Sequence, residues 1–261
     1  MKIKLMSWNT RLYMQGNYIN KIQEDIDEEK SKLVFDIIKK HVDADNGVGV
    51  AILQEIPYRI NAPYKKGKYD LKKWDKHPIF SLLMQIFPKD EYDVLYDNSN
   101  KWRIIQTVVI AQKGKVCLSE NMNSNSYYNF NIEDLECLAV HSNNAFELRN
   151  WLKSTGISPM LIAGDFNAGN YIMSNKKKDN EIAINRQNYL LLTEGYIDLF
   201  QGVFTTNYCK FTEPRQIDHV LIKNSYEFST KYDYENIILD TKICLSDHFP
   251  LYWTLIKKGD D

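Results

Sequence analysis

The sequence lacks an excess of basic residues, which is the usual mark of a dedicated nucleic-acid-binding protein. Lysine and arginine number 33 against 34 aspartate and glutamate residues, so the formal net charge is −1. This balance excludes a protein whose whole surface is a basic footprint for nucleic acid. Two lysine-rich stretches, residues 64–76 and 175–180, are typical of solvated loops. The alternative for each stretch is a basic loop at the edge of a binding site, where it contacts phosphate groups.

Cysteine is scarce, and long apolar runs are missing. The four cysteines show no CxxC spacing, which argues against a zinc site and against a dense disulfide framework. No run of about 18 apolar residues exists, so no membrane-spanning helix is expected. Residues 1–10 are too short and polar for the apolar stretch of a signal peptide. These absences predict a cytoplasmic protein with reduced thiols and without stable membrane insertion, and we expect a monomer.

Proline and glycine are also few, with 7 and 11 residues, and no Pro/Gly/Ser-rich linker divides the chain. No repeat with a period of tens of residues is visible. We therefore predict a single domain over residues 1–261. The Asn-rich stretch 119–131 is short enough to be one loop.

The sequence does contain apolar runs with the composition of β-strands. Several are apolar at both alternating positions, as expected for strands that are covered on both faces. The predicted strands are residues 2–8, 48–54, 92–96, 104–112, 135–141, 159–165, 217–222 and 249–256.

Helical patterns interrupt these strands at irregular intervals. Val34, Ile37, Ile38 and Val42 recur at helical spacing. A weaker helical pattern covers residues 183–195. Because strands outnumber helices without a strict βαβ repeat, the sequence favours packed sheets with helices outside them.

Two further segments are predicted to be helical. Asn144 can cap a helix that has Glu147 three residues later and Gly156 after its end. Residues 77–88 are expected to form a buried helix, and a membrane-binding apolar segment is the alternative.

Polar side chains gather at the ends of the predicted strands. A buried carboxylate without a partner is costly, so a set of unrelated ones is hard to explain by packing. If the strand ends converge, they form a carboxylate-rich cleft that a divalent cation would neutralise. The residues are Asn9, Glu55, His141, Asp165, Asn167, Asp218, Asp247 and His248.

Such a cleft suits metal-assisted phosphoester hydrolysis. Carboxylates such as Glu55 and Asp247 suit Mg²⁺ or Mn²⁺. The amide of Asn167 can donate to a phosphoryl oxygen, and His248 with Asp218 can take a proton from water. Each piece alone has a plainer explanation, because Gly, Asp and Asn also suit turns and single histidines are often structural.

Six short motifs occur together in one order. They are SWNT (7–10), LQE (53–55), VHS (140–142), GDFN (164–167), IDHV (217–220) and SDHFP (246–250). On these motifs the sequence resembles the endonuclease/exonuclease/phosphatase superfamily, which has the deoxyribonuclease I-like fold. The resemblance runs nearly end to end. It implies an α/β fold, a four-layer sandwich of two packed mixed β-sheets flanked by helices, and a divalent metal, usually Mg²⁺ with Mn²⁺ possible.

The resemblance also implies roles for residues. Glu55 matches the principal metal ligand with Asn9 beside it, and Asp247 matches a second metal-binding carboxylate. Arg11 sits where the deoxyribonuclease I branch places an arginine that contacts phosphate.

The resemblance to the superfamily also implies which residues are catalytic. Asp165 resembles the aspartate that positions the attacking water or the metal, and Asn167 the amide that holds the phosphate. His248 resembles the histidine paired with Asp218, as general base or as phosphate contact. His141 resembles the other active-site histidine, although no carboxylate partner for it is evident within residues 101–112.

These matches predict a divalent-metal-dependent phosphodiester hydrolase, a nuclease acting on DNA. Sphingomyelinases and inositol-phosphate phosphatases share GDFN and SDH, so a phospholipase C-type enzyme or an inositol or sugar-phosphate phosphatase is the alternative. A catalytically silent binding module is the alternative from another class. The sequence does not choose between endonuclease and exonuclease modes.

Overall fold

The structure of the protein, a computed structural model, describes residues 2–15, 25–45, 47–60, 76–99, 104–119, 126–169, 179–203, 205–206, 215–225, 228–233 and 245–257. Their helices are α1 (Glu28–Val42), α2 (Pro78–Ile86), α3 (Ala145–Thr155) and α4 (Asp179–Leu192), with a 3-10 helix at Leu12–Met14. The strands are β1 (Lys2–Asn9), β2 (Val48–Pro57), β3 (Tyr92–Leu95), β4 (Ile105–Gln112), β5 (Cys117–Leu118), β6 (Tyr127–Ile132), β7 (Leu135–His141), β8 (Leu161–Asp165), β9 (Tyr196–Asp198), β10 (Asp218–Lys223), β11 (Phe228–Asp233) and β12 (Leu251–Lys257).

The strands form two mixed six-stranded sheets. The first has the order β11-β12-β1-β2-β4-β3 and the second the order β5-β6-β7-β8-β10-β9. Each sheet has one parallel pair near its centre, β1 with β2 and β7 with β8, among antiparallel neighbours. Parallel neighbours end at the same edge of a sheet, so the register places His141 beside Asp165. Asp218 stands opposite Asp165 on the antiparallel side.

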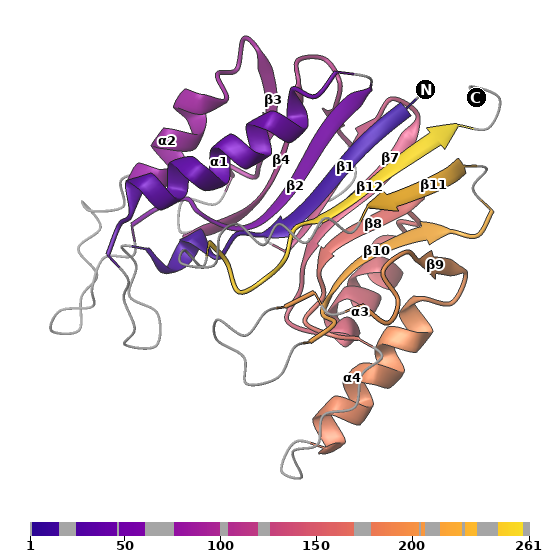
Figure 1. The fold of residues 1–261 in the computed structure, drawn as a ribbon. Coiled ribbons are helices and arrows are strands. Elements are labelled where there is room, and N and C mark those ends of the chain that lie inside the picture. The colour runs from indigo at the N-terminus through magenta and orange to yellow at the C-terminus, as the bar shows by residue number, and fades with distance from the viewer. Residues whose placement is uncertain are drawn as a thin grey trace, which may run out of the picture.

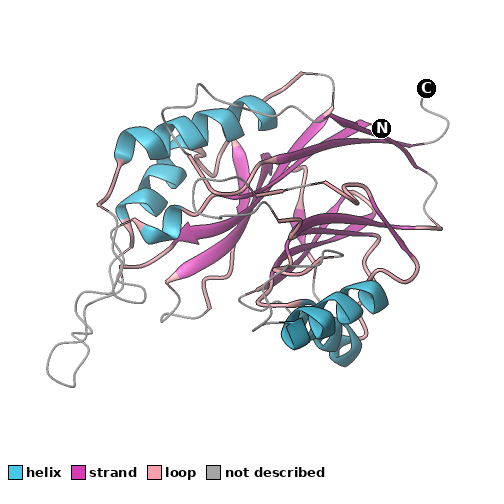
Figure 2. Cartoon of the chain, turned by 60° about the horizontal axis from the view of Figure 1, so that its bottom comes forward, coloured by secondary structure: helices cyan, strands magenta, loops and turns pink. Residues whose placement is uncertain are grey.

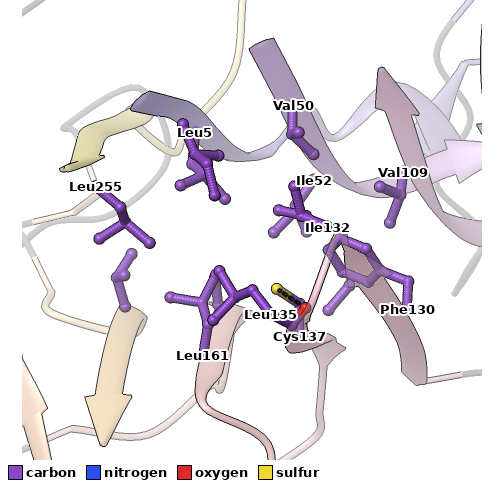
Figure 3. Close-up of a cluster of buried hydrophobic side chains, with 14 of the residues drawn as sticks. Leu5, Val50, Ile52, Val109, Phe130, Ile132, Leu135, Cys137, Leu161 and Leu255 are labelled. Carbon is purple, nitrogen blue, oxygen red and sulfur yellow. Dashed lines mark hydrogen bonds between the residues drawn. The ribbon is translucent and has the colours of Figure 1, made fainter. Parts of the chain in front are cut away.

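The main apolar core fills the space between the two sheets. Leu5 and Val50 from the first sheet face Phe130 and Leu161 from the second, and all are almost completely buried (Figure 3). Burying one such side chain contributes about 1.5–3 kcal/mol. The sheets are therefore held face to face, and their strand ends are brought together.

Helices cover the outer face of each sheet. On the first sheet, Phe35 of α1 and Phe80 of α2 are buried in one apolar cluster. On the second, Leu148 of α3 and Tyr189 of α4 are buried in another. Figures 1 and 2 show the two helix pairs on opposite sides of the packed sheets. This arrangement confirms the predicted α/β four-layer sandwich.

The helix predictions are confirmed at α2 and α3. The side chain of Asn144 accepts a hydrogen bond from the backbone of Glu147, and Gly156 ends α3 in the left-handed conformation with φ 68°. Ile79 and Leu83 are buried in α2, so residues 77–88 contain the buried helix and not an exposed apolar segment. Helix α4 begins earlier and ends earlier than the predicted range 183–195.

The prediction of one loop over residues 119–131 is wrong, because Tyr127–Ile132 form strand β6. Asn129 is fully buried in this strand, and its side chain donates to Glu136 Oε1 of β7 at 3.1 Å. Strand β7 therefore supplies an acceptor for the buried amide group of an asparagine that is typical of loops when the sequence is read alone.

Several expectations concern residues outside the described ranges. The lysine-rich residues 64–75 and 175–178 and the cysteines at 209 and 244 lie there. Within the described ranges, Cys117 is exposed, Cys137 is buried, and both are free thiols. No helix among the described residues is long and apolar enough to cross a membrane.

The stability of the fold is expected to depend on pH through His41, in the last turn of α1. Burial lowers the pKa of His41 to about 4, although hydrogen bonds with the backbone of Lys4 and Val50 oppose this effect. The unfolded chain, with an ordinary histidine pKa of about 6.5, takes up a proton before the folded protein does as the pH falls. The stabilising contribution is thus complete above about pH 6.5 and is lost between that pH and about 4.

We expect His41→Gln to flatten this part of the pH profile. Wild type should lose about 2 kcal/mol more unfolding free energy than the variant between pH 7 and pH 4.5, because only wild type has the titrating ring. Urea unfolding at both pH values measures the difference. Equal losses in the two proteins would contradict the assignment to His41.

Candidate active site

Three pairs of polar side chains join the two sheets where their central strands end. Asn9 Nδ2 of β1 donates to Asp165 Oδ2 of β8 at 2.9 Å. His141 Nε2 of β7 lies 3.4 Å from Glu55 Oε1 of β2. His248, before β12, and Asp218 of β10 form the third pair, with Nδ1 2.9 Å from Oδ2. Each pair takes one member from each side of the sandwich.

Asp165 lies at the centre of this group and is almost completely buried. Its Oδ1 accepts a 2.8 Å hydrogen bond from the backbone of Asn167, while Oδ2 accepts from Asn9. Burial and the charge of the opposing Asp218 raise the pKa of Asp165 to about 6, against the opposing effects of His248 and His141. The carboxylate is therefore ionised at neutral pH and retains a basicity that an exposed aspartate lacks.

His248 is held by Asp218 as a charged pair. The ring donates through Nδ1, so Nε2 faces the other way and lies 4.0 Å from Asp247 Oδ1. Burial alone lowers the pKa of His248, but the charge and hydrogen bond of Asp218, with the charge of Asp165, outweigh it and raise the pKa to about 10. Without a bound cation, this histidine is an imidazolium at neutral pH.

Glu55 reaches the site through an irregularity in β2. The pairing of β2 with β4 shifts register between Leu53 and Ile56, and Glu55 has φ 58°. Such a bulge turns a side chain out of the regular alternation and costs backbone strain that is common at functional sites. The structure thereby supplies the partner of His141 that is not evident in residues 101–112.

The contact between Glu55 and His141 favours the charged form of each partner. Burial raises the pKa of Glu55, but the hydrogen bond and charge of His141, with a hydrogen bond from Asn9, lower it overall. Burial lowers the pKa of His141, and the contact with Glu55 raises it overall. A carboxylate is thus kept negative in a partly buried position, as a cation ligand requires.

Asp247 lies beside Arg11 at the rim of the site. Arg11 Nε is 3.5 Å from Asp247 Oδ2, and the backbone of Arg11 donates to Asn9 Oδ1 at 3.1 Å. Burial raises the pKa of Asp247, against the charges of His248 and Arg11. Within the described part of the chain, Asp247 Oδ1 is buried without a hydrogen-bond partner, although buried acceptors are normally satisfied.

Among the residues that the structure describes, two groups of side chains have ligand atoms close enough together to hold a metal ion. The first is Glu55, His141 and Asp165, and the second is Asp165, Asp218 and His248, with all ligand atoms of a group within 4.8 Å of one another. Asp247 belongs to neither group. The buried carboxylates and the unsatisfied Asp247 oxygen fit a hard divalent cation, which prefers oxygen ligands.

Asn167 follows Asp165 in a tight turn. Its backbone is left-handed, with φ 48°, and its Nδ2 donates to the carbonyl of Ser142 at 2.9 Å. Asn167 is exposed at the surface of the site, and these bonds fix its side chain toward Ser142 and its backbone toward Asp165.

Trp8 and Ser246 hold the site together, although the sequence alone does not indicate this role. Trp8 Nε1 donates to the backbone carbonyl of His248 at 3.1 Å. Ser246 Oγ donates to the carbonyl of Asn9 at 2.7 Å and accepts from the backbone of His248 at 3.1 Å. Both lie inside the motifs at 7–10 and 246–250, but their partners become visible only when the first strand and the last loop are adjacent.

Comparison with solved structures gives the same fold. An endonuclease/exonuclease/phosphatase protein from Bacteroides vulgatus matches with a TM-score of 0.60 and 14% identity, covering 99% of this chain and 100% of that chain. The endonuclease domain of TRAS1, a telomere-specific non-LTR retrotransposon, matches with a TM-score of 0.54 and 11% identity over 98% of both chains. A mannosyl-6-phosphatase from Bacteroides thetaiotaomicron matches with a TM-score of 0.52 and 14% identity, covering 97% of this chain and 99% of that chain.

A scan of protein-family models and a search of curated proteins gave no match. Identities of 11–14% carry the fold and not the substrate. The chain therefore has the deoxyribonuclease I-like fold of the endonuclease/exonuclease/phosphatase proteins, as its motifs predict.

The charged state of His248 can be measured in protein treated with EDTA. We expect its ring to stay protonated through neutral pH, and Asp218→Asn to lower its pKa by about 1–3 units because an adjacent opposite charge is removed. NMR titration of the histidine ring signals measures both values, with Asp36→Asn on the exposed face of α1 as the control. A His248 that titrates near 6.5 in both wild type and Asp218→Asn would contradict the ion pair.

Proposed function

We propose that this chain is a divalent-metal-dependent phosphodiester hydrolase, and specifically a nuclease acting on DNA. The observation that carries the proposal is the set of three cross-sheet pairs, which gathers carboxylates, histidines and amides around Asp165. Catalytic groups with shifted pKa values in one buried cluster favour a reaction site over a structural ion-pair network.

Glu55, with Asn9 and Asp247, would hold the cation, for which we propose Mg²⁺, with Mn²⁺ as a substitute. Glu55 is kept ionised by His141, and the unsatisfied Oδ1 of Asp247 offers a second oxygen. When bound, such an ion neutralises phosphate charge and stabilises the oxygens that attack and leave.

The remaining roles follow from protonation and contact. Asp165 is basic enough, with a pKa of about 6, to orient the attacking water and accept its proton at neutral pH. His248, with a pKa of about 10, is proposed to bind the phosphate as a cation and not to act as the general base. The amide of Asn167 is proposed to donate to a phosphoryl oxygen, and His141 to contact the scissile phosphate near the leaving group.

Two observations support the choice of DNA as the substrate. Arg11 beside Asp247 favours a phosphodiester backbone, and the TRAS1 endonuclease domain has the same fold. The mannosyl-6-phosphatase of the same fold supports a sugar or lipid phosphate as the second candidate. A silent binding module is disfavoured because every group of the set is present. A monomer located in the cytoplasm remains part of the proposal.

Replacement of the central groups tests the reaction. Asp165→Ala and His248→Ala should each lower turnover by at least ~100-fold, because acid–base and electrostatic assistance are lost. The control is Asp36→Ala, an exposed aspartate on α1. Full activity in both site variants would remove the assignment.

The substrate is tested with supercoiled plasmid in one series and a panel of lipid and sugar phosphates in another, each with Mg²⁺ or with EDTA. Metal-dependent nicking that Asp165→Ala abolishes would support the nuclease. Phosphate or headgroup release with intact plasmid would instead assign the second candidate.

Metal binding can be measured without any substrate. We expect Glu55→Gln to weaken Mn²⁺ binding in calorimetric titration by about tenfold or more, because a charged ligand becomes neutral. Glu29→Gln, an exposed glutamate in the first turn of α1, is the matched control. Wild-type affinity in Glu55→Gln would mean that the cation binds elsewhere.

A further inference from the structure

The backbone of the turn that contains Asn167 is hydrogen-bonded to side chains outside the catalytic set. Asn167 has φ 48°, a left-handed backbone that costs most residues about 1–2 kcal/mol and asparagine less. Such strain persists only where the surroundings determine the conformation. The hydrogen bonds made by the backbone of this turn therefore decide whether the left-handed conformation is kept.

Two consecutive carbonyl groups of this turn accept hydrogen bonds from different elements. Asn185 Nδ2, in α4, donates to the carbonyl of Asn167 at 2.9 Å. His219 Nε2, in β10, donates to the carbonyl of Ala168 at 2.6 Å. These two bonds fix the two peptide groups that directly follow the left-handed position, while the Asn167 N–H before it is bonded to Asp165 Oδ1.

His219 is completely buried, and its ring has a defined orientation. Its Nδ1 donates to Asp198 Oδ2 at 2.8 Å, and Tyr189 donates to the same oxygen at 2.5 Å. The ring also packs beside Phe166 and Tyr189, with centroid separations of 5.1 and 4.6 Å. Asp198 thus aims the opposite nitrogen of His219 at the carbonyl of Ala168.

Asn185 uses both halves of its amide. Its Oδ1 accepts from the backbone of Ala145 at 3.0 Å, at the start of α3, while Nδ2 binds the Asn167 turn. Helix α4 is therefore joined to the site through this side chain. Asn188, one turn later, binds Arg149 Nη1 and the carbonyl of Ile184 instead of the turn.

We propose that His219 and Asn185 are positioning residues that hold the Asn167 turn so that its amide faces the substrate phosphate. The inference rests on the proposed function for the role of Asn167, but the effect on the turn itself does not. Misplacement of a positioned group by about 1 Å can cost on the order of 100-fold in rate.

Two substitutions of His219 separate the turn from simple packing. His219→Gln keeps a nitrogen where Nε2 donates to Ala168 but loses the donor to Asp198. His219→Asn keeps the donor toward Asp198 but loses the one to Ala168. We expect His219→Asn to lower kcat about tenfold or more with KM changed less than about threefold, since a transition-state contact is misplaced.

His219→Gln should keep kcat within about threefold of wild type while its Tm falls more than that of His219→Asn, because a buried carboxylate loses a donor. Wild-type kcat in His219→Asn, or equal loss of kcat in both variants, would overturn the positioning role of His219.

Asn185 provides the second variant should a His219 variant fail to fold, because it is only partly buried. Asn185→Ala should lower kcat about tenfold, whereas Asn188→Ala removes a contact between α3 and α4 and should leave kcat within about threefold. Equal kcat in the two alanine variants would overturn the role of Asn185.

An NMR readout distinguishes failure of this inference from failure of the proposed function. In metal-free protein labelled at asparagine, the Asn167 side-chain amide signals should shift in His219→Asn and Asn185→Ala and stay near wild type in His219→Gln and Asn188→Ala. This pattern would support the positioning of the turn even if wild type hydrolyses no phosphoester. Unchanged Asn167 signals in His219→Asn and Asn185→Ala would overturn it, whatever the activity.

Discussion

The hydrogen bond from Asn9 to Asp165 is the contact on which the site depends. It links the central strand of one sheet to the central strand of the other at 2.9 Å, with almost no exposure of either residue. The apolar core fixes the distance between the sheets, and this bond fixes their polar ends. The pairs Glu55 with His141 and Asp218 with His248 lie on either side of it, in the same order as the strands that carry them.

Electrostatic repulsion between carboxylates in the site explains which ligands the site can bind. Asp165 and Asp218 face each other on adjacent strands, and two buried carboxylates at such positions repel. The structure offsets the repulsion by placing an imidazolium, His248, against them. Pairs of compensating buried charges such as these add little to stability, because buried ion pairs contribute little net free energy. The cluster is well suited to binding a charged substrate and a cation.

Much of the fold and of the candidate site could be predicted from the sequence, because the apolar strands end in polar residues and the motifs occur in family order. What could not be predicted depends on contacts between the sheets. Glu55 is the partner of His141 only because a bulge in β2 turns it toward β7. Asn129 is typical of a loop in the sequence, and its place in a strand becomes clear only when Glu136 of β7 accepts from its side-chain amide. The donors behind Asn167 come from strands and helices that follow it in the chain, so no local pattern marks them.

Anomalous diffraction from crystals grown with Mn²⁺ would test the central claim most directly, which is that the cross-sheet pairs form a metal-dependent hydrolytic site. The account predicts one strong anomalous peak in contact with Glu55 and close to Asn9 and Asp247, with Asp165 and His248 on the side left for the phosphate. A peak remote from Glu55, or crystals with no ordered ion at saturating Mn²⁺, would contradict the account.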